Sequence, residues 1–177
     1  MRKCWLVGLL FAFIATCFLG CSPRKSPEAA GKNLKDVGQV MAIYAAQYSD
    51  RLPPNAATLL TTVDHGMVSK HSVAEILAGP DVTIPDAVRS ASPEEQATWL
   101  SKNGGVKVLA WGGHFVMQTK ASVTPLAILR PELYPGEPKL AVLYFDGHVE
   151  LRDRAEVEAM AKSAATVPET GASKPGG

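Results

Sequence analysis

The chain has 177 residues, a formal charge of +1 and three cysteines. That length is enough for one domain with a hydrophobic core. The near balance of 18 basic and 17 acidic side chains excludes the strong positive field that a nucleic-acid-binding protein needs, so nucleic acid is not an expected partner.

Residues 1–20 have the order of an export signal. Arg2 and Lys3 form a short cationic start, and the uncharged, mostly apolar run 4–19 follows. This run is shorter than the roughly 20 residues that span a bilayer comfortably. We therefore interpret residues 1–20 as a signal peptide, with an uncleaved signal anchor as the alternative.

The stretch Phe18-Leu19-Gly20-Cys21 resembles the lipobox of bacterial lipoproteins. The resemblance implies cleavage before Cys21 and a diacylglycerol on its thiol, so the membrane would be a partner through that lipid. Ser22 stands where an aspartate would suggest retention in the inner membrane of some bacteria. We therefore favour the outer membrane, with the domain facing the periplasm.

Cleavage before Cys21 changes what the mature chain contains. It leaves 157 residues and removes Arg2 and Lys3 but no acid, so the formal charge becomes −1. Cys4 and Cys17 leave with the signal, and Cys21 is alkylated. No disulfide, cysteine metal site or catalytic thiol is then expected.

Residues 21–31 contain two prolines and little that could pack, and they predict a flexible tether. The folded domain is predicted over residues 32–165. Its first element is a helix over 32–49, because apolar residues recur at spacings of three and four: Leu34, Val37, Met41, Tyr44 and Tyr48. The pair Pro53-Pro54 stops this helix.

Short helices are predicted next. Asn55 caps a helix through Val63, and Ser72 caps a second over Val73–Leu77. Residues 81–91 are poorly patterned and predict a loop. Ser92, Pro93 and Glu95 form a capping box with proline at the first helical position, which predicts a helix to about Lys102.

The second half of the chain is predicted to form strands. One hairpin joins 106–111 to 114–119 through Gly112-Gly113, and a short edge element covers 126–130. A second hairpin joins 139–145 to 148–152 through Asp146-Gly147, where a two-residue turn favours positive φ at both positions. Asp153 is then expected to cap a last helix to about Ala165, and residues 166–177 are predicted to be disordered.

Three segments together resemble a known family. Residues 33–44 followed by Arg51-Leu52-Pro53 resemble the part of a type II secretion pseudopilin helix that follows its membrane segment. Residues 140–149 resemble the closing hairpin of the same family, and 108–111 resemble a strand before it. The similarity is greatest to the pseudopilin-like group of planctomycete and verrucomicrobial proteins that end in an Asp-Gly hairpin. It implies a long helix packed on a small antiparallel sheet.

The chain departs from that family in two places. The family begins with a prepilin leader and a long hydrophobic half-helix, and here a lipobox-like signal stands instead. This departure implies that the chain does not polymerise into a pilus. Many members also carry a histidine with nine residues between it and the Asp-Gly pair, where this chain has Gly136.

Candidate chemistry was weighed against structural roles. The order Asp146-Gly147-His148 fits a metal or catalytic site, but a hairpin turn already explains Asp146 and Gly147, so we interpret both as turn residues. The other histidines, His65, His71 and His114, lie far apart in the sequence and form no metal-ligand pattern. The acidic pairs Glu94-Glu95 and Glu156/Glu158 fall in the first turns of predicted helices, where carboxylates are favoured by the helix dipole. The sequence predicts no catalytic, cofactor-binding or metal-binding residue.

The expected fold is α+β, pseudopilin-like, with short extra helices and a C-terminal helix. The stripe of the first helix is expected to face Val108, Leu109, Val142, Leu143 and Phe145. The function expected first is a non-catalytic envelope lipoprotein that binds another protein, such as a secretion or pilus component. The alternatives are a periplasmic ligand-binding protein or enzyme with an unrecognised site, and a purely structural surface protein.

Overall fold

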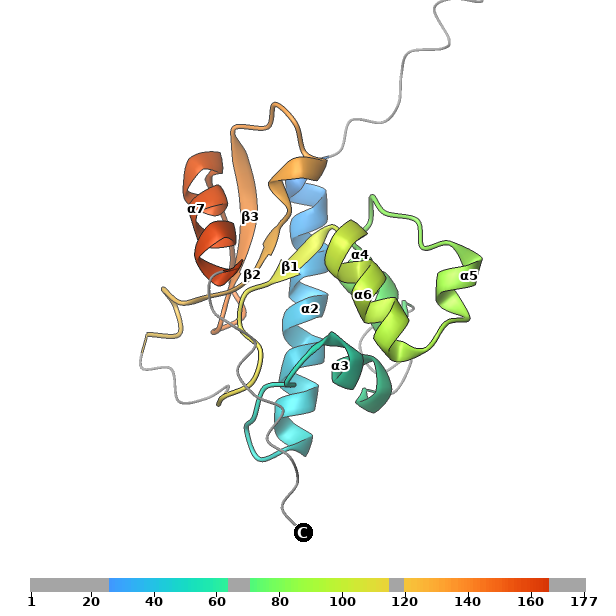
Figure 1. Cartoon of the computed structure of the whole chain (residues 1–177). Coiled ribbons are helices and arrows are strands. Elements are labelled where there is room, and N and C mark those ends of the chain that lie inside the picture. The colour runs from blue at the N-terminus through green and yellow to red at the C-terminus, as the bar shows by residue number, and fades with distance from the viewer. Residues whose placement is uncertain (1–25, 64–70, 115–119, 166–177) are drawn as a thin grey trace, which may run out of the picture.

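The structure is a computed structural model that describes residues 26–63, 71–114 and 120–165 (Figure 1). The described elements are, in chain order, α2 (Pro27–Gln47), α3 (Ala56–Thr62), α4 (Val73–Ala78), α5 (Asp86–Arg89), α6 (Pro93–Asn103), β1 (Val106–Val108), β2 (Pro125–Leu129), the 3-10 helix η1 (Pro131–Leu133), β3 (Lys139–Tyr144), β4 (Val149–Asp153) and α7 (Arg154–Ala165). The expected mixture of helices with an antiparallel sheet is confirmed. The signal, Cys21 and the tail 166–177 lie outside the described residues.

Helix α2 begins at Pro27, five residues before the predicted start, so the boundary between tether and domain at residue 31 is wrong. Proline is well tolerated in the first turn of a helix, where its missing N–H has no partner to lose. Ala30 is fully buried, and a Cβ on Gly31 would already touch Ala141 and Val149 at 3.6 and 3.5 Å. Residues 27–31 therefore belong to the packed domain.

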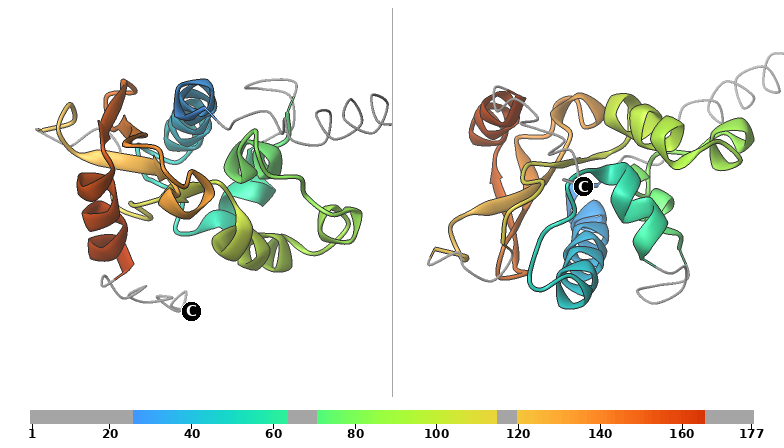
Figure 2. Two further views of the ribbon diagram at one scale, coloured as in Figure 1. Left: turned by 90° about the horizontal axis from the view of Figure 1, so that it is seen from above. Right: turned by 60° about the horizontal axis from the view of Figure 1, so that its bottom comes forward.

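The four strands form one antiparallel sheet in the order β1-β2-β3-β4. Helices α2 and α7 cover its opposite faces (Figures 1 and 2). The glycines of α2 lie over Ala141, Leu143 and Val149 on one face. On the other face, Lys107 of β1 donates its ammonium to the Ala161 carbonyl of α7 at 2.6 Å, close to the negative end of that helix.

The far side of α2 is covered by the short helices α3 and α4, and α6 packs on these two (Figure 1). The three predicted caps are confirmed: Asn55 accepts from the Thr58 N–H, and Ser72 and Ser92 each form a capping box. The predicted loop at 81–91 is partly wrong, because residues 86–89 form α5. The Arg89 guanidinium holds this turn, since it donates to the Ile84 carbonyl and to Glu75.

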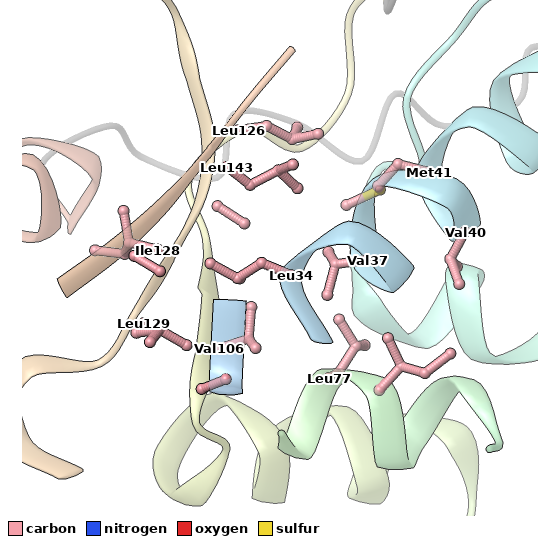
Figure 3. Close-up of a cluster of buried hydrophobic side chains, with 14 of the residues drawn as sticks. Leu34, Val37, Val40, Met41, Leu77, Val106, Leu126, Ile128, Leu129 and Leu143 are labelled. Atoms are coloured by element: carbon pink, nitrogen blue, oxygen red, sulfur yellow. The ribbon is translucent and has the colours of Figure 1, made fainter. Parts of the chain in front are cut away.

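The core lies between α2 and the sheet. Leu34, Val37 and Met41 are fully buried, and Figure 3 shows them close to Leu126 and Leu143 of the sheet. Phe145 is buried too. Val142 is buried on the opposite face, because side chains alternate along β3 and Leu143 faces α2, so its expected contact with the α2 stripe is wrong. Val108 and Leu109 are half-buried.

Tyr48 is not a core residue. Its side chain is 43% exposed, because α2 ends at Gln47 and the chain turns through Ser49 and Asp50, both at positive φ. The Tyr48 ring instead stacks on Tyr44 with a centroid distance of 4.3 Å. The buried stripe of α2 therefore ends at Tyr44, whereas the spacing predicts that it extends to Tyr48.

The predicted hairpin around Gly112-Gly113 is wrong. Strand β1 pairs with β2, so residues 125–129 form an inner strand rather than an edge. The glycine turn bonds to the chain after α2: Gly112 donates to the Pro53 carbonyl, and Gly113 accepts from Leu52. His114 bridges to Arg51, and the rest of the predicted strand, 115–119, lies outside the described residues.

Two arginines brace the domain. The Arg130 guanidinium donates to the carbonyls of Leu100, Ser101 and Lys102 in the last turn of α6, where carbonyls run out of helical partners. The Leu100 carbonyl also accepts from the Gly104 N–H. Arg154 donates to the carbonyls of Pro131 and Tyr134 and so holds the segment that follows β2.

In the described residues, no helix is long and apolar enough to cross a membrane.

Candidate functional site on the closing hairpin

The Asp146-Gly147 turn joins β3 to β4, as the sequence predicts. The Gly147 N–H donates to the Tyr144 carbonyl at 2.9 Å, and the Tyr144 N–H donates to the His148 carbonyl at 3.0 Å. Three residues, 145–147, therefore form the loop instead of two, and among them only Gly147 has a positive φ, of 86°. A three-residue hairpin loop of this kind is a turn followed by a glycine in the left-handed conformation. The Asp-Gly pair occurs in both loop types, so the sequence alone does not distinguish three loop residues from two.

His148 folds back onto the turn. Its Nδ1 lies 2.5 Å from Oδ1 of Asp146, and its backbone N–H donates to the same oxygen at 3.1 Å. The hydrogen bond with the His148 ring lowers the pKa of the Asp146 carboxyl below its ordinary value. The carboxylate therefore fixes both the turn and the orientation of the imidazole.

The pair continues along the strands as a network. The His148 ring stacks on Tyr144 with a centroid distance of 4.4 Å and an interplanar angle of 5°. Arg152 donates from Nε to the Tyr144 hydroxyl at 3.0 Å. The same nitrogen lies 3.4 Å from Glu150 and 3.8 Å from Glu156 of α7. We call these six residues the hairpin cluster: Tyr144, Asp146, His148, Glu150, Arg152 and Glu156.

An aspartate that holds one imidazole nitrogen is the arrangement that orients a general base. In the hairpin cluster, however, the aromatic ring stacked on the imidazole has its hydroxyl engaged by a cation, and the charged side chains are exposed. In the part of the chain that the structure describes, no group of three or more His, Cys, Asp and Glu side chains could hold a metal ion. The geometry accounts for Asp146 and Gly147 as turn residues.

The other acidic residues singled out in the sequence are used within the fold. Glu95 closes the capping box of α6, and Glu158 bonds to Arg154 at 2.8 Å. His71 lies 3.7 Å from Glu75, and His65 lies outside the described residues. Asp153 is the last residue of β4, directly before α7.

Two grooves lie on the surface of the described residues. The first runs between α5 and α6 and is lined by Val88 and by Trp99, which is packed against the core. The second, which we call the terminal groove, lies where α2 begins and is lined by Ser26, Pro27, Glu28, Glu137, Pro138, Lys139 and Leu151. Sequence reasoning missed the terminal groove, because it joins segments more than 100 residues apart in the chain.

The residues that sequence reasoning missed in the hairpin cluster are Tyr144, Glu150 and Arg152. One signal was available, since Glu150 and Arg152 alternate with Val149 and Leu151 and therefore share the other face of a strand.

Comparison with known proteins identifies no relative: no family model, curated protein or solved structure matches this chain.

Proposed function

We propose that this protein is a lipid-anchored envelope protein whose pseudopilin-like domain binds another protein and does not act as a catalyst. The observation that carries the proposal is the order of the first 27 residues. A charged start, an apolar run and Gly20-Cys21 precede a helix whose first residue, Pro27, already belongs to the folded domain. Acylation at Cys21 would attach that domain to a membrane.

The early start of α2 sets how far the domain stands from the lipid. Six positions separate Cys21 from Pro27, and fully extended they reach at most about 20 Å. This reach is shorter than the one that a tether ending at residue 31 would allow. The terminal groove would therefore face the membrane surface, and the C-terminal end of α2 would point away from it.

The fold agrees with the pseudopilin resemblance in one respect. A long first helix packs along a small antiparallel sheet that closes in the Asp146-Gly147 hairpin. The apolar half-helix that packs a pseudopilin into a filament would here be replaced by the lipid. One acyl chain gives only marginal membrane binding, whereas two or three give stable attachment. The domain would thus be displayed singly or in small assemblies, and a secretion or pilus component is the proposed partner.

Cell fractionation tests the anchor. The full chain should be recovered with the outer membrane as a product that starts at Cys21. Cys21→Ser should keep its signal peptide and be missing from the outer membrane, with an unchanged melting temperature of the domain. The matched variant Ser22→Asp should keep the protein in a membrane but move it toward the inner membrane. Equal recovery of Cys21→Ser and the unaltered chain in the outer membrane would refute lipid attachment.

Cross-linking tests the partner. The same adduct should form reproducibly when the acylated protein is cross-linked in its own cells. Stoichiometric bound metal, or a rise of several degrees in melting temperature with a small molecule, would favour the enzyme or ligand-binding alternative instead.

A further inference from the structure

Strand β4 is an outer strand of the sheet, and its register shows which backbone groups face outward. Hydrogen bonds join Tyr144 to His148 and Arg154 to Pro138. Because hydrogen-bonded pairs alternate along an antiparallel ladder, Glu150 and Arg152 also direct their N–H and C=O groups toward β3. Val149, Leu151 and Asp153 therefore direct theirs to the free edge.

Neither helix that packs on the sheet closes this edge. Helix α7 starts directly after Asp153, but it crosses the sheet face toward β1, where its Ala161 carbonyl meets Lys107. Helix α2 covers the opposite face, where Gly31 lies against Val149. Within the described residues, no strand pairs with the outward side of β4. The Asp153 carbonyl accepts the first hydrogen bond of α7, whereas the N–H groups of Val149, Leu151 and Asp153 and the carbonyls of Val149 and Leu151 are left at the edge, and an unpaired edge is a template for another strand.

We infer that β4 pairs with β4 of a second copy of this chain, antiparallel and about a two-fold axis through Leu151. In this register the outward residues face one another: Leu151 faces the partner's Leu151, and Val149 faces the partner's Asp153. The central Leu151 pair exchanges two backbone hydrogen bonds, and each flanking pair adds the bond from the Asp153 N–H to the partner's Val149 carbonyl. The half-buried Leu151 side chains come together at the axis.

Charge selects this register. With Leu151 at the centre, Glu150 lies directly opposite the partner's Arg152, and Arg152 lies opposite the partner's Glu150. A shift that centres Glu150 would place two glutamates opposite each other, and one that centres Arg152 would place two arginines there. Cross-strand pairs of opposite charge stabilise a sheet and like charges destabilise it, so β4 is complementary to an inverted copy of itself.

The position of the terminal groove makes the pairing compatible with two anchors in one bilayer. Leu151 lines that groove together with Ser26, Pro27 and Glu28, so the start of α2 lies close to the axis. The N-terminal segments of both copies would leave the dimer side by side. Pairing itself does not depend on acylation, and a failure of one proposal leaves the other standing.

Charge reversal in the full chain in detergent micelles tests the inference, with sedimentation equilibrium as the readout. Glu150→Arg places two cations opposite each other in both cross-strand pairs, and Arg152→Glu places two carboxylates there. Each variant alone should therefore dimerise at least tenfold more weakly. In an equimolar mixture of the two variants, a mixed dimer has opposite charges in both cross-strand pairs, so dimer should be recovered as mixed pairs. The double variant Glu150→Arg/Arg152→Glu should dimerise like the unaltered chain.

Amide hydrogen exchange locates the contact. Protection at Val149, Leu151 and Asp153 should rise with protein concentration, while Glu150 and Arg152 stay protected throughout. Two results would overturn the inference: a single-chain mass at every concentration with fast exchange at the three outward amides, or a dimer that Glu150→Arg leaves unchanged. The Arg152–Glu150 pair within one chain stays broken when the two single variants are mixed. Recovery of dimer in the equimolar mixture therefore separates lost charge pairing between chains from lost folding.

Discussion

Helix α2 packs on two sides that are built differently. On the sheet side it meets β2, β3 and β4, and fully buried apolar side chains from segments far apart in the chain close over it. On the other side it meets α3 and α4, on which α6 packs, and each of these three helices begins with a side-chain cap. Both sides bury apolar side chains, among them Leu59, Ile76 and Leu77 on the helical side, and the helical side has these local capping hydrogen bonds in addition.

The largest expected effect is a truncation on the sheet side. Leu143 is fully buried in β3, and a Cβ on Gly38 of α2 would lie 3.4 Å from it. Leu143→Ala should lower the free energy of unfolding by about 2–5 kcal/mol, because it leaves a cavity that the backbone cannot close. Urea unfolding measures this effect, with the half-buried Leu151→Ala as a milder control. An unchanged midpoint for Leu143→Ala would contradict the assignment of the core.

The next effect concerns the residue that joins the two sides. Arg130 follows β2 and caps the last turn of α6, and burial lowers the pKa of its guanidinium. Arg130→Met should cost about 1.5–3 kcal/mol, since hydrogen bonds made by a charged group are lost and helix carbonyls are left without partners. Arg152→Met, at an exposed position, should cost less than about 1 kcal/mol. An equal decrease in the free energy of unfolding for the two variants would show that the hydrogen bonds of Arg130 do not stabilise the domain.

A smaller effect is expected at a cap on the helical side. Ser92→Ala removes the side chain that accepts from the Glu95 N–H and should cost about 1 kcal/mol. Ser90→Ala, two residues earlier and without a side-chain cap of its own, should change the free energy of unfolding by less than about 0.5 kcal/mol. The two thermal unfolding curves should therefore differ, and identical curves would mean that the capping box contributes nothing.

The smallest effect is a pH dependence on the same side. A hydrogen bond from Arg89, aided by the Ser72 N–H, lowers the pKa of Glu75 below its ordinary value. A carboxyl with a depressed pKa in the folded state stabilises the protein above its unfolded pKa of about 4.3, and this contribution disappears as the pH falls through the folded value. Glu75→Gln should make the free energy of unfolding less dependent on pH below about pH 4.5. A profile equal to that of the unaltered chain would exclude this pair as a contributor.

The same comparison explains what the sequence could predict. Caps and helix stripes depend on neighbours in the chain, so Asn55, Ser72, Ser92 and most of the α2 stripe were identified from spacing alone. The Asp146-Gly147 turn was found for the same reason. Tyr48 was misplaced because the positive φ of Ser49 and Asp50, neither a glycine, leaves no clear mark in the sequence.

Contacts between segments that are far apart in the chain were harder to predict from the sequence. Local spacing gave β1 a partner across Gly112-Gly113, but the backbone of that turn bonds to Leu52 and Pro53 instead. Pro27 and Ala30 were assigned to the tether because nothing near them in the chain indicates that they pack into the domain. The hairpin cluster likewise depends on residues that only the sheet register brings together, apart from the charge alternation at Glu150 and Arg152.

The most direct test of the central proposal is the intact mass of the protein extracted from its own membranes. The account predicts a chain that starts at Cys21 and carries the added mass of a diacylglycerol group on the thiol, with or without a further acyl chain. A chain that starts elsewhere, or a Cys21 with an unmodified thiol, would contradict it.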